Sequence, residues 1–415
     1  MPSNMNKLSI KAWQWGLYDF ANSLANIAVS FYFTLWFVEN LKGTEAGISI
    51  VVAIVTILLL CSLPQIGARA DHHGHHARLL TILTGGTIVT LCALAFAAFS
   101  IKEPSLWSSL LILGIYGVFQ YLYQSSVSVY TSLLRFVGTI GSNEEVRVAG
   151  VGNAMGQLGN VIGLLVALPV ATTFGRPAAF LSGAILFLLF VLPALRWIRK
   201  LETKALVAPA PIKFIAAWKE LRRSPDVFHY LVGYYLFADA VLTLQLFLTL
   251  YLTIVAKLSD SAKTLIMAAA LLVAVAGAML AKYIVRRMSV KKAIETSILF
   301  WAILLTLFAL VSHPILFIII TLLNGFAFGV LFSLSQAYYS TLVPPEQQGR
   351  YFGIYTIFER ASSLLGPLLW SVVIIAFSSY GEWRYRLAVL SLAFLVLLSL
   401  AFIRKVKDSS VAEQQ

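Results

Sequence analysis

Charged residues are scarce in this chain. Asp, Glu, Lys and Arg make up 12% of its 415 residues, whereas hydrophobic residues make up 59%. A water-soluble domain carries about a quarter of charged residues, so this balance is too apolar for a surface that faces water. The sequence excludes an ordinary soluble domain and predicts that lipid surrounds most of the chain.

Cysteine and catalytic motifs are nearly absent as well. Cys61 and Cys92 both fall within apolar stretches, so neither a disulfide framework nor a thiolate metal site is indicated. The sequence has no Gly-x-x-x-x-Gly-Lys-Ser/Thr phosphate loop and no convincing nucleophile and base set. We therefore expect neither an enzyme nor direct ATP coupling, and no cofactor.

Long polar stretches are missing except for residues 199–227, which separate an amino-terminal half, 1–198, from a carboxy-terminal half, 228–415. Twelve other stretches have about the 20 apolar residues that a membrane helix needs. Lipid offers the backbone no hydrogen-bond partner and these stretches lack strand alternation, so each predicts a helix. The expected fold is an all-α polytopic membrane protein with two six-helix bundles. The expected spans are 13–38, 46–68, 78–100, 106–133, 147–172, 177–198, 228–255, 262–284, 292–312, 315–339, 350–377 and 385–403.

Acidic residues number 18 against 31 Lys and Arg, which gives a net charge of +13. Most of the basic residues fall in the termini and in alternate loops, the pattern that marks the cytoplasmic side of a membrane protein. The excess therefore predicts cytoplasmic termini and contact with anionic lipid, not nucleic acid. Short termini favour a bacterial inner membrane over an organelle.

The two halves share a sequence repeat. Residues 16–22 recur as 233–239, so that Asn22 stands opposite Asp239, and residues 130–133 recur as 339–342. Arg147, Gly150 and Gly163 reappear at the same spacing as Arg350, Gly353 and Gly366. A repeat of this size in a membrane protein is typical of a transporter.

Glycine is concentrated in the fifth span. Gly152, Gly156, Gly159 and Gly163 follow three- and four-residue spacing, which lets two helix backbones approach closely. We expect this face to pack between the two halves.

The segment between the second and third spans carries a further motif. Gly67, Asp71 and Gly74, followed by Arg78, resemble the Gly-x-x-x-Asp-x-x-Gly signature of the major facilitator superfamily, where it forms a gating loop. The equivalent segment of the second half, 281–292, lacks the Asp and the second Gly. The resemblance implies the major facilitator fold and transport of a small molecule by alternating access. We expect the transporter to be a monomer.

Within that superfamily, residues 15–23 are similar to the first-helix signature of the vacuolar amino-acid effluxer-like branch, and so are segments 342–345, 351–355 and 365–369. The branch usually shows Asn-Asp-Gly in its seventh helix, where this chain has Ala-Asp-Ala around Asp239. The resemblance implies a transporter of amino acids or related solutes.

Five polar residues are the strongest candidates for a binding site inside the membrane. Ionisable groups at the centre of a bilayer cost at least about 2.5 kcal/mol when they face lipid, so they are expected to face protein or water. Asp19, Asn22 and Asp239 are predicted to bind a small polar solute or a proton, and Glu359 with Arg360 to supply both signs of charge. Alternatives are a helix-end hydrogen bond for Asp19 and a permanent ion pair of Arg360 with Asp239 or Glu359.

Further lining of that site is expected from the fourth and tenth spans. The candidates are Tyr121, Gln124, Ser128, Asn324, Ser335 and Gln336.

A histidine run lies in the signature segment, at His72, His73, His75 and His76. Clustered imidazoles bind zinc, and histidine also changes charge near neutral pH. A polar inner loop with Asp71 as a cap is favoured over both, and we predict no metal. A non-transporting receptor or scaffold with a degenerate facilitator fold remains the alternative to a transporter.

Overall fold

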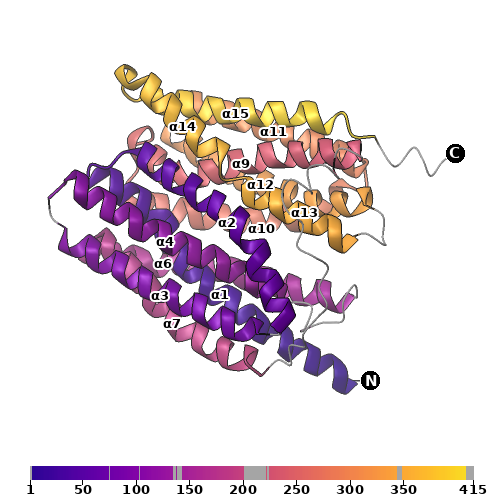
Figure 1. The fold of residues 1–415 in the computed structure, drawn as a ribbon. Helices are drawn as coiled ribbons and strands as arrows, with labels where there is room; N and C mark the ends of the chain where they lie inside the picture. Colours follow the sequence, from indigo (N-terminus) through magenta and orange to yellow (C-terminus); the bar gives the residue numbers. More distant parts are fainter. Residues whose placement is uncertain are drawn as a thin grey trace. The chain divides into compact units, whose positions relative to one another are not determined.

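The computed structural model describes residues 2–73, 75–101, 103–133, 137, 143–200, 221, 224–343 and 348–407. The described residues form helices and connecting turns, without strands. Twelve of their segments are long and apolar enough to cross a membrane, which confirms the predicted number of spans. The chain divides into two compact units, Met1–Pro211 and Ile212–Gln415, each a bundle of helices (Figure 1).

Unit 1 contains the first six spans, which run side by side (Figure 1). Its helices are α1 Pro2–Glu39, α2 Glu45–His73, α3 His76–Ser100, α4 Leu106–Ser132, α6 Asn143–Phe174 and α7 Arg176–Ile198. Unit 2 contains the other six. Its helices are α9 Pro225–Ile254, α10 Asp260–Ile284, α11 Val290–Leu310, α12 Pro314–Leu342, α13 Gln348–Ala361, α14 Leu365–Ala376 and α15 Trp383–Ile403, with a short 3-10 turn at Ser378–Tyr380.

The glycine face of α6 packs against α1 of its own unit. A Cβ at Gly163 would lie 2.6 Å from Ile27 Cγ2, and one at Gly159 would overlap the carbonyl oxygen of Phe20. The predicted close approach is therefore present, but the predicted partner, the other half, is wrong for this face. The three- and four-residue spacing of the glycines identifies a face of small residues on one helix. That spacing does not specify which other helix packs against the face.

The eleventh span is broken, although the sequence predicts one helix over 350–377. Helix α13 ends at Ala361 and α14 begins at Leu365. Pro367 stands in the first turn of α14, where it has no N–H to donate to Ser363 and its ring excludes a regular helix through that residue. The N–H of Leu364 instead bonds to Ala361 O at 3.1 Å, which closes a turn between the two helices.

The signature segment is mostly helical, not a loop. Helix α2 continues to His73 and α3 begins at His76, so Gly67 and Asp71 lie on α2, whereas Gly74 falls outside the described residues. Ala and Arg have high helix propensity, so the helix continues through residues 68–70 although the apolar run has already ended.

Candidate functional site

Asp239 lies at the break in the eleventh span. Its Oδ2 accepts the backbone N–H of Gly366 at 2.5 Å, and its side chain is completely buried. The N–H groups of a first helical turn have no partner in their own helix and carry partial positive charge. A carboxylate from α9 thus caps α14 across the helix contact.

Asp239 also interacts with the backbone of Leu364 at the break. Among the residues that the structure describes, Oδ1 has no hydrogen-bond partner. A buried carboxylate oxygen without a donor is unfavourable, by about 1–3 kcal/mol for a buried polar group. The geometry therefore suits a group that gains a proton or a ligand at this oxygen.

The neighbouring turns of α9 also contact α14. One turn before Asp239, the Tyr235 hydroxyl interacts with the backbone of Leu365. One turn after it, Thr243 Oγ1 donates to Asp239 O at 2.7 Å. A Cβ at Gly366 would overlap Thr243 Oγ1, so glycine is required for α14 to approach this closely.

Glu359 and Arg360 occupy the last turn of α13, directly before the break. Glu359 is exposed and Arg360 is half-buried, with Nε buried and without a hydrogen-bond partner among the described residues. A cation at a helix C-terminus is favoured by the helix dipole. In the described part of the chain, no ion pair joins Arg360 to Asp239 or to Glu359, so the alternative of a permanent pair is not what the structure has.

Asn22 is the counterpart of Asp239 in unit 1, and it also is buried, at 3% exposure. Its Nδ2 donates to Tyr123 Oη on α4 at 3.1 Å, and its Oδ1 is buried without a partner among the described residues. The repeat thus places an incompletely satisfied amide on α1 and an incompletely satisfied carboxylate on α9.

Asp19 is half-buried against the glycine face of α6. A Cβ at Gly156 would lie 2.8 Å from Asp19 Oδ2, so the absence of a side chain there makes room for the carboxylate. Helix α1 begins at Pro2, which places Asp19 in the helix interior. The alternative of a helix-end hydrogen bond is therefore wrong.

An aromatic cluster holds α1 against α4 one turn from Asp19. Trp15 and Tyr18 both stack on Tyr130, with ring centroids 3.9 and 4.5 Å apart, and Tyr130 Oη donates to Trp15 O at 2.9 Å. Tyr339, the repeat partner of Tyr130, stacks on Tyr230 of α9 at 5.7 Å. Stacked aromatic pairs stabilise by about 0.5–1.5 kcal/mol, so both units fix their first helix in a similar way.

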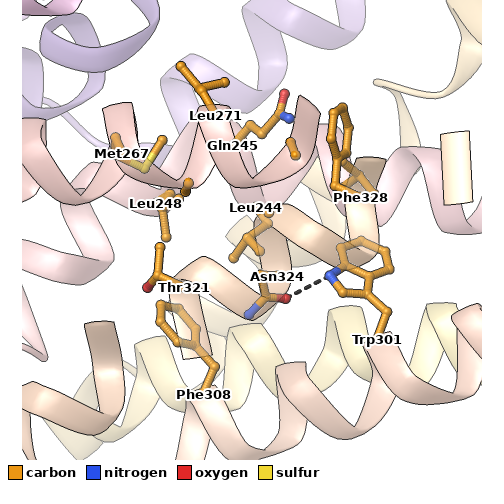
Figure 2. A pocket seen from close by; sticks show the side chains of 14 residues that line it. Leu244, Gln245, Leu248, Met267, Leu271, Trp301, Phe308, Thr321, Asn324 and Phe328 are labelled. Carbon is orange, nitrogen blue, oxygen red and sulfur yellow. Dashed lines mark hydrogen bonds between the residues drawn. The ribbon is translucent and has the colours of Figure 1, made fainter. Parts of the chain in front are cut away.

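Asn324 lines a pocket inside unit 2 (Figure 2). The pocket lies between α9, α10, α11 and α12 and has a cavity volume of about 90 Å³, which is smaller than a typical small-molecule site. Asn324 Oδ1 accepts Trp301 Nε1 at 2.7 Å and its Nδ2 donates to Ile320 O at 2.9 Å. The wall is otherwise mainly apolar, from residues such as Leu244, Met267 and Phe328.

The other expected lining residues divide between bonded and open positions. Tyr121 donates to Ser62 on α2 at 2.9 Å, and Ser335 donates to Leu331 O at 2.6 Å. Gln124 and Ser128 are half-buried on α4. The side chain of Gln336 lies outside the described residues.

The histidine run is only partly described. His75 is exposed and His76 is buried, whereas the side chains of Asp71, His72 and His73 lie outside the described residues. Among the residues that are described, no three His, Cys, Asp or Glu side chains are grouped as a metal site would require. The reading of this run therefore stays a prediction.

Two buried cations lie just inside the ends of the predicted spans 262–284 and 385–403, and the sequence analysis gave them no role. Lys263 is fully buried on α10 and pairs with Asp260 at 2.7 Å. Arg386 is 6% exposed and donates to Ala309 O and Val311 O at 2.7 and 2.8 Å. Arg386 therefore satisfies carbonyl groups at the C-terminus of α11, a structural role that the flanking polar sequence hides.

The fold is that of solved transporters. The structure of the nucleoside transporter NupG matches with a TM-score of 0.74 at 15% identity. The match covers 96% of this chain and 100% of NupG. A bacterial homologue of the human lysosomal transporter Spinster has a TM-score of 0.72 at 11% identity, with 96% of each chain covered. The fold is thus that of the major facilitator superfamily, as the sequence predicts.

Sequence relatives define the branch. The profile described as "Vacuole effluxer Atg22 like" matches residues 35–415. The chain therefore belongs to this family, which makes it a multi-pass membrane transporter and not an enzyme. The uncharacterized transporter YxiO of Bacillus subtilis is 23% identical over 99% of both chains. Autophagy-related protein 22 of Yarrowia lipolytica is 22% identical over 60% of this chain, which spans about half of that longer protein, 49%.

Proposed function

We propose that the protein is a secondary active transporter that moves a small polar solute, an amino acid or a related metabolite, by alternating access and with proton coupling. The observation that carries the proposal is the burial of Asp239 beside a broken helix, with one carboxylate oxygen unpartnered. Ionisable residues within membrane spans mark ion and substrate pathways. Broken helices supply free backbone groups to such sites.

The proposed solute is zwitterionic because the candidate residues offer both signs of charge. In unit 2, Asp239 would bind an ammonium group and Arg360, whose Nε has no partner in the described chain, would bind a carboxylate; in unit 1, Asp19 is a second candidate for an ammonium group. Asn22, Gln124 and Asn324 would add neutral hydrogen bonds, and Glu359 a further acceptor. The family description, a vacuole effluxer, supports transport of a solute, and amino acids are proposed because they carry both signs of charge.

Proton coupling is proposed to act at Asp239. Asp239 is a buried carboxylate inside a membrane span, and ionisable groups in such positions mark proton and substrate pathways. The solute and the proton would then compete for one buried carboxylate. Such competition couples the movement of the two.

The proposed gate is the signature segment with Gly67, Asp71, Gly74 and Arg78. Its place is the cytoplasmic side of a bacterial inner membrane, with both termini on that side. The concentration of basic residues near those ends supports this orientation. The linker 199–227 would join the amino-terminal bundle, 1–198, to the carboxy-terminal bundle, 228–415.

Solute flux into proteoliposomes tests the proposal. A thermal-shift screen of amino acids first identifies a ligand that stabilises the folded protein, and labelled uptake of that ligand is then compared between wild type and Asp239→Asn. We expect uptake to fall at least about tenfold, equivalent to about 1.4 kcal/mol, and its pH dependence to disappear. The matched control is Asp226→Asn, which removes a carboxylate from the first turn of the same helix.

The control variant is expected to transport like wild type. Wild-type uptake and pH dependence in Asp239→Asn would contradict the assigned site. Absence of flux for every solute that binds would instead favour a receptor or scaffold.

A further inference from the structure

A basic concavity lies in unit 1 where α3 begins and α7 ends. It is lined by His75, Arg78, Thr81 and Arg199, with Ile82 at its inner side. Arg199 Nε donates to Thr81 Oγ1 at 3.3 Å, and the Arg78 and Arg199 side chains are both exposed. Because α3 and α7 are membrane spans that meet here with their ends, the concavity lies at the level of the lipid headgroups.

Among the residues that the structure describes, no acidic side chain pairs with the arginines of this concavity, Arg78 and Arg199. Arg196 and Lys200 are exposed close by on the same end of α7, and the first turn of α3 adds the partial positive charge of a helix N-terminus. The site therefore suits an anion with several oxygen acceptors, such as a phosphate group.

An exposed apolar stripe continues from each arginine toward the middle of the span. On α3, Ile82 and Val89 follow Arg78 at helical spacing and are 61% and 68% exposed. On α7, Arg196, Leu192 and Leu189 precede Arg199 at three- and four-residue spacing, and the two leucines are 44% and 61% exposed. Residues three and four apart share a helix face, so each stripe leads directly from the cations into the hydrocarbon region.

Gly85 leaves the α3 stripe open in the middle. A Cβ at this position would meet no atom within 4 Å, so the surface between Ile82 and Val89 is recessed and unobstructed. A recess between two apolar side chains accommodates an extended alkyl chain.

We propose that the surface formed by Arg78, Ile82, Gly85, Arg199 and Leu192, here termed the α3–α7 groove, binds one anionic phospholipid. The phosphate lies between Arg78 and Arg199, and an acyl chain follows Ile82 and Gly85. A free phosphate ion would satisfy the arginines but not the apolar stripes that start beside them, which is why the lipid is assigned. The proposal is independent of the transported solute.

Native mass spectrometry of the full-length protein in detergent tests this assignment, with phosphatidylglycerol as the anionic probe and phosphatidylcholine as the neutral one. Each Lys or Arg near a lipid surface contributes about 1 kcal/mol. We expect the double variant Arg78→Gln with Arg199→Gln to weaken phosphatidylglycerol binding by about 30-fold. The pair of Lys substitutions at the same positions, which keeps the charge, should retain most of the affinity.

The matched control is Arg286→Gln with Arg287→Gln. These exposed arginines follow α10 in unit 2, in the segment that corresponds to the one before α3, and their loss removes the same charge. Because these arginines do not line the groove, affinity should stay within about twofold of wild type. An equal loss in both double variants would show general attraction to anionic lipid and overturn the proposal.

Gly85→Leu separates lipid from free phosphate. The added side chain fills the recess without changing the charge, so it should reduce binding of phosphatidylglycerol but leave the arginines intact. Unchanged lipid binding in Gly85→Leu, together with displacement of the lipid by inorganic phosphate, would assign the site to a soluble anion and overturn the lipid proposal. Thermal unfolding of every variant checks that it is folded.

Discussion

Two helix contacts are formed by repeated segments of the sequence. In unit 1 helix α1 packs against α6, and in unit 2 helix α9 packs against α13 and α14. Of these two contacts, the one in unit 2 contains a broken helix. Helix α6 runs unbroken from Asn143 to Phe174, whereas its counterpart stops at Ala361 and restarts at Leu365. Gly163 and its repeat partner Gly366 both pack directly on the neighbouring helix. The close approach is therefore shared, and the break is a property of unit 2.

Proline accounts for part of this difference. Pro367 stands where the repeat has Leu164 in unit 1, and proline removes a backbone hydrogen bond within a helix. However, Pro169 and Pro193 lie inside the continuous helices α6 and α7. A proline alone does not break a span in this protein.

What the break adds is a partner for the freed backbone groups. Asp239 accepts the N–H of Gly366, whereas Asn22, at the repeated position, bonds to the Tyr123 side chain and to no backbone group of α6. Lipid provides no replacement for a missing hydrogen bond. The comparison teaches that the carboxylate and the break stabilise each other, so that at the repeated position unit 2 has a carboxylate where unit 1 has an amide.

The largest expected effect is therefore at Asp239. Asp239→Ala leaves the Gly366 N–H buried without an acceptor, whereas Asp239→Asn keeps an acceptor and removes only the charge. We expect the alanine variant to be less stable than the asparagine variant by about 1–3 kcal/mol, measured by unfolding in mixed micelles. Equal stabilities would show that the hydrogen bond does not hold the break.

Pro367→Ala sharpens this prediction by allowing the helix to continue. Once residue 366 donates within its own helix, the acceptor on α9 is no longer needed. The cost of Asp239→Ala should fall by at least about 1 kcal/mol in the Pro367→Ala background, a coupling that a double-mutant cycle measures. Additive effects of the two substitutions would separate the carboxylate from the break.

The sequence predicted the spans, the repeat and the family because apolar length and residue spacing are recorded locally. Asp239 was also found, since a carboxylate inside an apolar run is conspicuous. The sequence did not identify Gly366 N–H as its partner, because that bond depends on a helix end 127 positions away. Nor did it predict the burial of Arg386, whose acceptors are Ala309 O, Val311 O and Ser312 Oγ at the end of α11, at least 74 positions away.

The next largest effect concerns the glycine face that unit 1 uses instead of a break. A Cβ at Gly159 overlaps the carbonyl oxygen of Phe20, and backbone can yield only if α1 and α6 separate. Gly159→Ala should cost about 1–3 kcal/mol of stability. The matched control is Gly85→Ala on α3, where a Cβ meets nothing within 4 Å, and this variant should be neutral or up to about 1 kcal/mol more stable. Similar changes in stability for both variants would show that the close packing of Gly159 on α1 does not determine the cost.

A smaller effect is expected at the neutral counterpart site. Asn22→Ala removes the hydrogen bond to Tyr123 Oη and should cost about 1 kcal/mol. Tyr123→Phe removes the same bond from the other side, so the double variant should lose little more than either single variant. If the two losses add in full, the bond contributes nothing and the polar groups act separately.

The smallest effect distinguishes the ion pairs at the helix ends of the two units. Arg176 and Glu39 in unit 1 are 2.6 Å apart, with side-chain exposures of 19% and 32%, and Arg176 also donates to Asn40. Lys257 and Glu382 in unit 2 are 3.0 Å apart, with exposures of 74% and 44%. Exposed pairs contribute about 0.2–1 kcal/mol and are screened by salt. Glu39→Gln should lower the unfolding temperature measurably at low salt. Glu382→Gln should not, because water can solvate the exposed Lys257 ammonium group once the carboxylate is removed. A larger loss in Glu382→Gln would reverse this order and show that burial does not govern the strength of these pairs.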